Sequence, residues 1–357
     1  MTNYYPESEE IEETEIEEAP KRSRFRKWAW LALGLLFLVL ASGGYLAYKA
    51  NLTLSKISTQ PASLWKNIIR MLPLEKSSLL GRILPVEKSP FEEERINLLL
   101  LGIRGIGDPH GGLLTDTLMV ISLKPETEEV AMISIPRDIY LEMPGQGISR
   151  KINEAYGLGE GSGYGGGLTL AKKAVSRVTG LKIHYAFSID FRAFKEIIDA
   201  LGGITVYVPR ELRETGQWSG YEFYVPVGYQ KMDGETALFY ARARFSTSDF
   251  DRARRQQEIL IGIKNKAWTT GTLINPIRIN ALLNAVGRNV RTDLEAWEMK
   301  ELIELAQRMK ITKVVKKVFD TTSQGLLYST FIDEAYVLLP VGDNFDKIQE
   351  TCQGIFD

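Results

Sequence analysis

The chain has 357 residues, with 44 Lys and Arg against 45 Asp and Glu, two His and one Cys. Its content of 44% hydrophobic and 25% charged residues argues against a disordered chain and a multi-span membrane bundle, and the length allows one large domain or two smaller ones. The single Cys352 excludes an intramolecular disulfide and a Cys-rich zinc site. With a net charge of −1, no nucleic acid partner is expected.

The first 48 residues fall into three parts of different charge. Residues 1–19 carry eight Glu and no base, which is typical of a disordered tail, and residues 21–27 carry five bases. Residues 28–48 hold no charged side chain, and as a helix they would span roughly 30 Å, the thickness of a bilayer's hydrocarbon core. We therefore predict a single N-terminal transmembrane helix at 28–48. A cleaved signal peptide and a buried core helix are the alternatives.

The charges beside this segment predict its orientation. Because the basic cluster precedes the span, residues 1–27 are assigned to the cytoplasm and the chain after residue 48 to the outside of the cell membrane. Without the five bases and eight acids of residues 1–27, the chain keeps 39 bases and 37 acids, a net charge of +2. A basic functional site outside must therefore be a local group of residues.

The extracellular part is predicted to be one domain behind a stalk. Residues 49–94 combine short apolar runs with four prolines, which indicates a stalk without chemistry of its own. From residue 95 onward, strand-like and helical segments alternate. The strand-like segments are residues 96–102, 117–123, 130–135, 204–208, 222–227 and 238–245. The helical segments are residues 168–178, 191–201, 251–268 and 294–309.

This alternation predicts an α/β fold with a central mixed β-sheet flanked by helices over residues 95–320. Seven glycines within residues 157–167 indicate a surface loop between elements. Residues 321–357 are predicted to form a C-terminal extension packed on the domain, with a strand at 336–340 and a helix at 345–355.

Arginines stand out at the ends of these segments. Arg137 lies in Ser134-Ile135-Pro136-Arg137-Asp138, where proline stops the preceding strand. Open α/β sheets bind ligands at the C-terminal ends of strands, which makes Arg137 a candidate ligand-binding residue. Arg242 and Arg244 alternate with Tyr240 along the predicted strand at 238–245, so the three side chains are expected to share one face.

A second polar group follows in the next predicted helix. Arg252, Arg255 and Gln256 fall at positions i, i+3 and i+4 and are expected to share one face, whereas Arg254 faces away. Taken singly, each arginine is explained by salt bridges to the nearby acids Asp249, Asp251 and Glu258. As a set they predict a site for a multiply charged anion, because adjacent guanidiniums repel one another unless an anion lies between them. Pyrophosphate has the matching geometry.

Asp116 lies where a loop enters the strand at 117–123. A carboxylate near phosphates commonly holds Mg²⁺, which prefers oxygen ligands. An Asx turn or a cap at the start of the strand explains the same residue equally well.

Taken in series, these motifs resemble the LytR-CpsA-Psr family over residues 95–265, behind the single N-terminal membrane anchor usual for that family. The motifs are residues 97–102, Thr115-Asp116-Thr117, residues 134–138, Lys151-Ile152-Asn153-Glu154-Ala155-Tyr156, Leu201-Gly202-Gly203, the segment 234–244 and the segment 251–257. The resemblance implies an enzyme that moves a glycopolymer from a polyprenyl-pyrophosphate carrier to cell-wall peptidoglycan and forms a phosphodiester. Its partners are then the lipid-linked glycan donor, the peptidoglycan acceptor and the membrane.

The resemblance also implies roles for single residues. Arg137, Arg244, Arg252 and Gln256 would hold the pyrophosphate, Asp116 would bind Mg²⁺ or help to activate the attacking hydroxyl, and the polyprenyl tail would lie in an apolar groove between sheet and helices. The predicted catalytic residues are Asp116, Arg244 and Arg252, and the predicted metal ligand is Asp116. The predicted pyrophosphate ligands are Arg104, Arg137, Arg242, Arg244, Arg252, Arg255 and Gln256.

One position departs from the family pattern. Two residues beyond the glycine that ends the first strand, the family usually carries an Asp that partners the metal, and here that residue is Arg104. Either Asp108 replaces the missing carboxylate, or Arg104 clamps phosphate in place of metal, or the enzyme is weak; we favour phosphate binding with altered metal use. The alternative functions are a non-catalytic polyprenyl-pyrophosphate-binding or regulatory protein of the cell envelope, and a pyrophosphatase that uses water.

Overall fold

The computed structural model describes residues 49, 52–53, 91, 93–105, 112–163, 165–218, 220–267 and 276–357. The predicted tail and span, most of the stalk, and Asp108 lie outside the described residues. None of the described helices is both long and apolar enough to cross a membrane. The chain divides into Met1–Tyr48 and Lys49–Asp357, and the fold below is that of the second unit.

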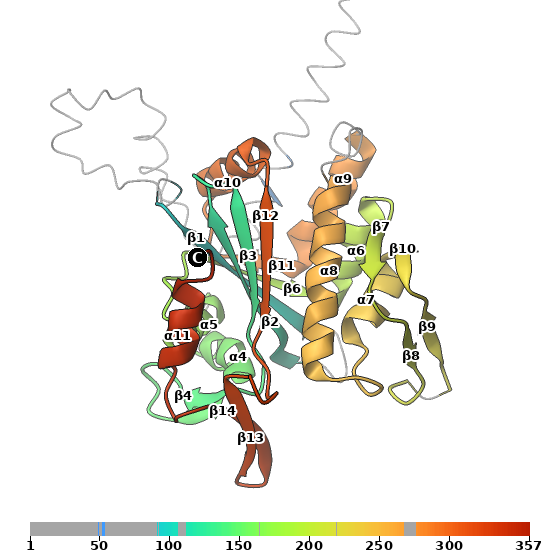
Figure 1. Ribbon diagram of the computed structural model, residues 1–357. Helices are drawn as coiled ribbons and strands as arrows, with labels where there is room; N and C mark the ends of the chain where they lie inside the picture. The colour runs from blue at the N-terminus through green and yellow to red at the C-terminus, as the bar shows by residue number, and fades with distance from the viewer. Residues whose placement is uncertain are drawn as a thin grey trace, which may run out of the picture. The chain divides into compact units, whose positions relative to one another are not determined.

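A six-stranded mixed sheet forms the centre of this unit (Figure 1). Its strands, in spatial order, are β11 (Val290–Thr292), β6 (Tyr185–Asp190), β1 (Ile96–Gly105), β2 (Gly112–Lys124), β3 (Glu129–Ser134) and β12 (Lys313–Val318). β2 runs antiparallel to both β1 and β3, whereas β6 is parallel to β1 and β12 is parallel to β3. The predicted α/β fold with a mixed sheet is confirmed.

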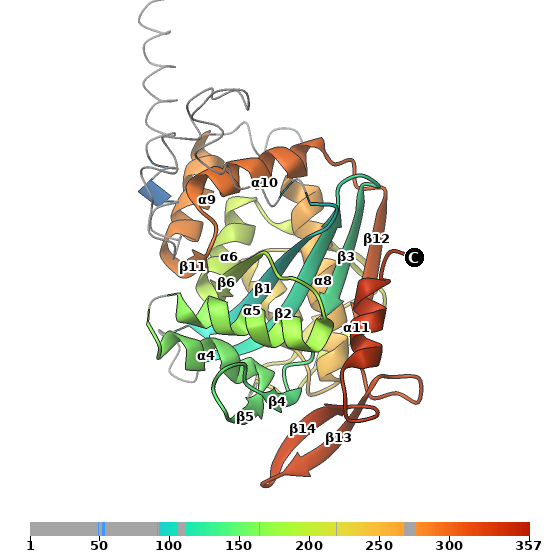
Figure 2. The same ribbon diagram turned by 90° about the vertical axis from the view of Figure 1, so that its left-hand side faces the viewer.

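β1 is a nearly continuous apolar run because helices cover both faces of the central strands. On one face, Leu99 and Leu101 share a buried core with Leu168 of α5 (Gly166–Thr179). α4 (Ala155–Glu160) and α11 (Asp346–Gln353) lie on the same face, and α6 (Phe191–Ala200) and α8 (Asp249–Ala267) lie on the other (Figure 2).

A second layer packs against α6 and α8 and forms a core of its own. Its elements are β7 (Ile204–Val208), β8 (Leu212–Glu214), β9 (Phe223–Val225), β10 (Gly228–Met232) and α7 (Gly234–Arg242). The remaining elements are β4 (Tyr140–Glu142), β5 (Ser149–Lys151), a 3-10 helix (Ile152–Glu154), α9 (Pro276–Asn289), α10 (Ala296–Arg308), and the hairpin of β13 (Leu327–Ile332) and β14 (Ala335–Pro340). The strand and helix predicted at 336–340 and 345–355 are confirmed as β14 and α11.

One of the predicted elements is wrong, and another is only partly confirmed. The segment 238–245 is not a strand, because α7 extends to Arg242 from an N-cap at Asp233, whose side chain accepts from the Thr236 amide at 2.8 Å. The glycines of 157–167 form a loop only in part: Gly161, Gly163 and Gly165 lie between the helices, whereas the other four lie in α4 and at the start of α5. A Cβ atom at Gly159 would clash with the backbone of Gly166, so these glycines allow the two helices to approach closely.

Candidate functional site

An apolar cavity of about 420 Å³ lies between the central sheet and the second layer. Leu100 and Met119 of the sheet contribute to its lining, together with apolar side chains of α6, α7 and α8. Along α8 the lining extends from Arg252 to Ile263, about 16 Å at the rise of an α-helix. The cavity thus lies between sheet and helices, where the family resemblance implies a groove for a polyprenyl tail.

The polar part of this lining gathers the predicted site residues. Seven of the eight line the cavity, namely Arg104, Asp116, Arg137, Arg242, Arg244, Arg252 and Gln256. They come from β1, β2, the loop after β3, α7 and the loop after it, and α8. The eighth, Arg255, does not line the cavity.

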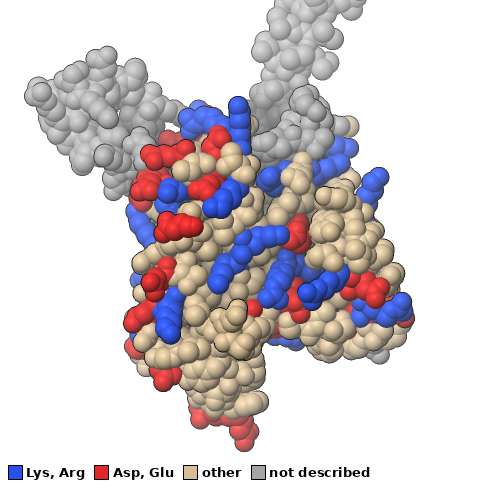
Figure 3. Space-filling view, viewed as in Figure 1, with Lys and Arg blue, Asp and Glu red and all other residues tan. Residues whose placement is uncertain are grey.

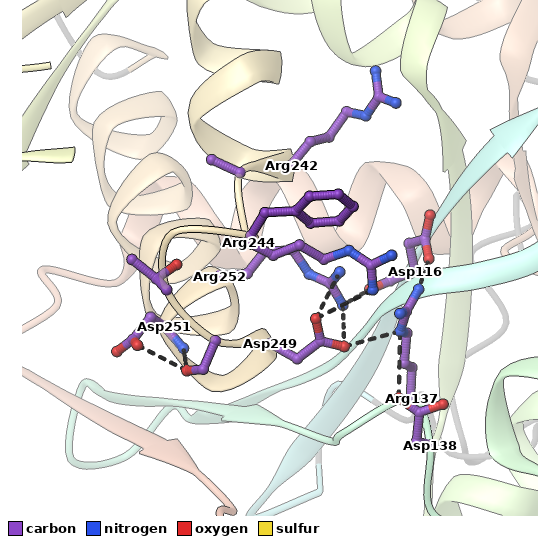
Figure 4. A network of polar contacts seen from close by, with 12 residues as sticks. Asp116, Arg137, Asp138, Arg242, Arg244, Asp249, Asp251 and Arg252 are labelled. Atoms are coloured by element: carbon purple, nitrogen blue, oxygen red, sulfur yellow. Dashed lines mark hydrogen bonds and ion pairs between the residues drawn. The ribbon is translucent and has the colours of Figure 1, made fainter. Parts of the chain in front are cut away.

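Asp249, the first residue of α8, joins three of the arginines (Figure 4). Its carboxylate accepts from Nε of Arg137 at 3.0 Å and lies 3.5 Å from Nη1 of Arg244. The guanidinium of Arg252 approaches both carboxylate oxygens, at 3.2 and 3.3 Å. A carboxylate at this position also interacts favourably with the helix dipole. Asp249 thus holds three guanidiniums that line the cavity.

Asp116 joins the same group from β2. It accepts from Nε of Arg104 at 3.3 Å and from Nη1 of Arg137, and its backbone carbonyl accepts from Arg252 at 3.3 Å. Arg104 follows Ile103, and the pairing of β1 with β2 is irregular on both sides of Ile103. Irregularities of this kind redirect side chains in a strand.

The site carries more positive than negative charge. Five bases, Arg104, Arg137, Arg244, Arg252 and Lys151, pair with three carboxylates, Asp116, Asp138 and Asp249, which leaves a surplus of two positive charges. Burial lowers the pKa of Arg252 to about 10, with Asp249 opposing and Arg137 adding to that effect. An anion with two or more charges would compensate the crowded guanidiniums.

Asp116 is ionised in this surrounding. Burial alone would raise its pKa, but the charges of Arg137, Arg252 and Arg104, together with the Arg137 hydrogen bond, outweigh burial and hold the pKa below its usual value. A carboxylate with a lowered pKa is a weak general base. Asp116 is therefore better suited to positioning guanidiniums than to removing a proton.

Arg242 and Gln256 make other contacts in the cavity. The Arg242 guanidinium lies over the ring of Phe191, 4.6 Å from its centroid, and points away from the other labelled arginines in Figure 4. Nε2 of Gln256 donates to the carbonyl of Ala241 at 3.2 Å. Tyr240, Arg242 and Arg244 do not share a strand face, because helix α7 ends between the two arginines.

Of the acids named as alternative salt-bridge partners, Asp249 pairs with Arg244 and Arg252, and Asp251 pairs with Arg254. Arg254 also pairs with Asp320 at 3.2 Å and does not line the cavity, as expected for a residue facing away from Arg252. The predicted alternative partner Glu258 pairs instead with Lys316, at 2.6 Å.

Arg255 is buried but turns its guanidinium toward the backbone. Nε donates to the carbonyl of Tyr240 at 3.0 Å, and Nη2 donates to the carbonyl of Ala243 and to Oγ1 of Thr247, the latter at 3.3 Å. These acceptors include the end of α7 and the loop that carries Arg244. The structure therefore gives Arg255 a positioning role in place of the predicted direct contact with the anion.

Replacing Arg255 by alanine is expected to destabilise the domain. The change leaves buried carbonyls without their donor, which costs about 2–3 kcal/mol of unfolding free energy. Chemical denaturation of Arg255→Ala beside the parent protein measures this loss. Unchanged stability together with lost donor binding would instead show that Arg255 contacts the anion directly.

The described residues do not fit a Mg²⁺ site. Both oxygens of Asp116 accept from guanidiniums, and Arg104 occupies the position of the expected second carboxylate. Across the described part of the chain, no group of three or more His, Cys, Asp or Glu residues could hold a metal ion. The prediction of Mg²⁺ remains untested, and we assign it no step in the chemistry below.

Sequence reasoning missed two residues that position Arg244. The buried Glu214 accepts from the amides of Phe245 and Ser246 at 2.9 and 3.1 Å, and Oε1 of Gln217 accepts from the Arg244 amide at 2.8 Å. Neither residue belongs to a recognisable motif. Asp249 was predicted only as one salt-bridge partner among several acids, although Arg244 and Arg252, which lie close to it in the sequence, offered a signal.

The chain combines a mixed α/β fold with an apolar cavity that ends in an arginine cluster. The chain matches the model of the LytR_cpsA_psr family over residues 75–354 and belongs to that family. The resemblance of the motifs is thereby confirmed. The match extends beyond residues 95–265 and includes the C-terminal hairpin.

Relatives within the family carry specific names. The polyisoprenyl-teichoic acid–peptidoglycan teichoic acid transferase TagU of Oceanobacillus iheyensis is 30% identical over 330 residues, covering 91% of this chain and 95% of that protein. TagU of Bacillus cereus is 28% identical over 275 residues, which cover 76% of this chain and 81% of that protein. Among solved structures, TagV of B. subtilis has 26% identity and a TM-score of 0.57, covering 74% of this chain and 97% of that one. The structure of TagT bound to LIIa-WTA shares the fold, with 22% identity and a TM-score of 0.58. The match covers 76% of this chain and 94% of that one.

Proposed function

We propose that this protein is a phosphotransferase that moves a glycopolymer from a polyprenyl-pyrophosphate carrier to peptidoglycan. The observation that carries the proposal is the apolar cavity ending at four guanidiniums, which suits a lipid tail with a pyrophosphate head. The names of the relatives, which specify polyisoprenyl-linked teichoic acid and peptidoglycan, support the same classes of donor and acceptor.

In the proposed reaction, a sugar hydroxyl of the acceptor attacks the phosphorus nearest the glycopolymer. A new P–O bond forms, the bond between that phosphorus and the bridging oxygen breaks, and polyprenyl phosphate leaves with the bridging oxygen. The proton of the attacking hydroxyl passes to the leaving phosphate or to solvent. Arg137, Arg244 and Arg252 neutralise the pyrophosphate and stabilise the charge that develops on the leaving group, which is where most of the catalysis in phosphoryl transfer lies. Asp116 and Asp249 hold these guanidiniums in place before the donor arrives.

The predicted membrane anchor fits this function. A span at residues 28–48 with the following chain outside the cell would keep the domain near a donor whose tail resides in the bilayer. The proposed location is therefore the cell membrane, with a cytoplasmic N-terminus and an extracellular catalytic domain.

A reconstituted assay tests the function. The full-length protein in detergent is given a labelled polyprenyl-pyrophosphate-linked glycan with and without peptidoglycan, and polyprenyl phosphate and wall-bound label are measured. Acceptor-dependent release of both products is expected. Release without an acceptor would identify a hydrolase, and donor binding without release would identify a binding or regulatory protein.

Filling the cavity is expected to affect long-chain donors selectively. Leu260 lies in the cavity lining between Arg252 and Ile263, so a tryptophan there competes with the lipid tail. We expect Leu260→Trp to raise the KM for a long-chain donor about tenfold, the equivalent of one or two buried methylenes. A donor with a tail of two isoprene units should be less affected. The control Leu260→Met conserves the side-chain volume, and an equal effect on both donors would contradict the placement of the tail.

A further inference from the structure

A second hollow, of about 230 Å³, lies beside the first. The two share Asp116, Arg137, Arg252 and Gln256 in their linings. Arg137, Arg252 and Gln256, three of the predicted pyrophosphate ligands, therefore line both spaces. The proposed lipid tail accounts for only one of them.

The second hollow differs from the first in chemistry. Apolar side chains such as Leu118, Ile135 and Phe250 line part of it, but it also presents Asp138, Ser248 and Asp249, with Tyr336 and Leu338 contributed by β14. Arginines, carboxylates and hydroxyls in one lining suit a ligand rich in hydroxyl groups, because they both donate and accept hydrogen bonds. A sugar chain has this chemistry.

The hairpin β13–β14 is attached directly to the arginine-bearing loop. The amide of Leu338 donates to the carbonyl of Asp138 at 2.9 Å, and Asp138 follows Arg137. Leu327, Val337 and Leu338 anchor the base of the hairpin in buried positions. Its outer half projects from the domain (Figures 1 and 2).

Exposed aromatic side chains line one face of this outer half. Phe331 is 70% exposed and lies directly opposite Tyr336, which is 41% exposed, with ring centroids 6.0 Å apart. Because side chains alternate along strands, Tyr336 and Leu338 share a face, so the aromatic pair continues the lining of the second hollow. An exposed aromatic surface next to a hollow marks an interaction site.

Charge narrows the choice of partner for this face. Asp333 and Glu334 form the turn between the strands, and the tip of the hairpin is acidic in Figure 3. An acidic tip disfavours an anionic lipid surface. The C–H faces of pyranose rings pack against aromatic rings, whose faces are negative, and their hydroxyls reach the polar groups of the hollow.

We propose that the second hollow and the Phe331–Tyr336 face of the hairpin bind the acceptor, a glycan strand of peptidoglycan. The inference rests on the proposed transferase function and adds the route of the acceptor. Donor tail and acceptor strand then reach the arginines from different spaces. Such an arrangement suits a displacement in which attacking and leaving oxygens lie roughly in line.

Acceptor kinetics of hairpin variants test this site. Phe331→Ala and Tyr336→Ala are each compared with Tyr328→Ala, which removes an exposed aromatic ring from the opposite face of the same hairpin. We expect the first two variants to raise the acceptor KM about tenfold, as the loss of one aromatic contact implies, with the donor KM unchanged. The Tyr328→Ala control should behave like the parent protein.

The outcomes separate the site from the function. A normal acceptor KM in both test variants would overturn the proposed acceptor site. So would a rise in the acceptor KM of the control, or in the donor KM, equal to the rise in the acceptor KM of the test variants. None of these results would contradict the transferase function. If the parent protein transfers nothing, binding of enzymatically solubilised glycan strands is measured by calorimetry, which requires no reaction. Binding that is lost in Phe331→Ala but kept in Tyr328→Ala supports the site, and binding unaffected by either change, or none by the parent, rejects it.

Discussion

Replacing Arg252 by alanine is expected to lower kcat/KM for transfer about 1,000-fold, the effect of removing a preorganised donor to a developing negative charge. Arg252 is buried at the polar end of the cavity, and its guanidinium contacts both oxygens of Asp249 and the backbone of Asp116. The fold should persist, because Asp249 keeps Arg137 and Arg244 as partners. Steady-state transfer of labelled donor and thermal unfolding measure the two effects.

Two further variants show whether charge or geometry matters. Arg252→Lys keeps the charge but loses the planar fork, and should recover only part of the lost activity. Arg254→Ala removes a neighbouring arginine that pairs with Asp251 and Asp320 outside the cavity, so it should transfer at the parent rate. Arg244→Ala should lose activity as Arg252→Ala does. Near-normal turnover by both Arg244→Ala and Arg252→Ala would reject the proposed anion site.

The variant Arg104→Asp is expected to convert the site into one that depends on Mg²⁺. It replaces a guanidinium by a carboxylate beside Asp116, which removes a phosphate ligand and offers a metal two acidic residues. Without Mg²⁺ we expect transfer to fall about 100-fold, as for the loss of one preorganised donor. Millimolar Mg²⁺ should restore much of that loss.

The parent protein and Arg104→Ala serve as controls for this experiment. A chelator should change the activity of the parent little, because guanidiniums occupy both oxygens of Asp116. Arg104→Ala should lose activity without gaining a response to Mg²⁺. Strong inhibition of the parent by the chelator would show that Asp116 exchanges its arginines for a metal when the donor binds.

Long elements with a clear pattern could be predicted from the sequence. The apolar run of β1 and the helical spacing of α5 and α8 are set by burial of their own side chains. Part of α7 was predicted to be a strand because the helix is only nine residues long, and Leu238 and Tyr240, two residues apart, also fit the period of a strand. The contact that starts the helix, the Asp233 cap, lies before the predicted segment. The glycines of α4 and α5 were predicted to form a loop. Their role is to allow the two helices to approach closely, and such a contact depends on the tertiary fold and is not visible in the sequence.

The candidate site could be predicted as a set of residues but not as a network. Arg137, Arg244, Arg252 and Asp116 were selected from separate segments, and the fold brings them together. The sequence could not show that Arg255 points to the backbone, since that depends on where α7 ends. Nor could it show that Asp249 joins three arginines, because two of those partners come from other elements.

The position of the arginines between two hollows has a kinetic consequence. Because the donor tail and the acceptor are assigned to different hollows, neither substrate must depart before the other arrives, so the enzyme can hold both in a ternary complex. Initial-rate plots at several fixed acceptor concentrations should then give intersecting lines, the signature of a sequential mechanism, in contrast to the parallel lines of a double displacement through a covalent enzyme intermediate.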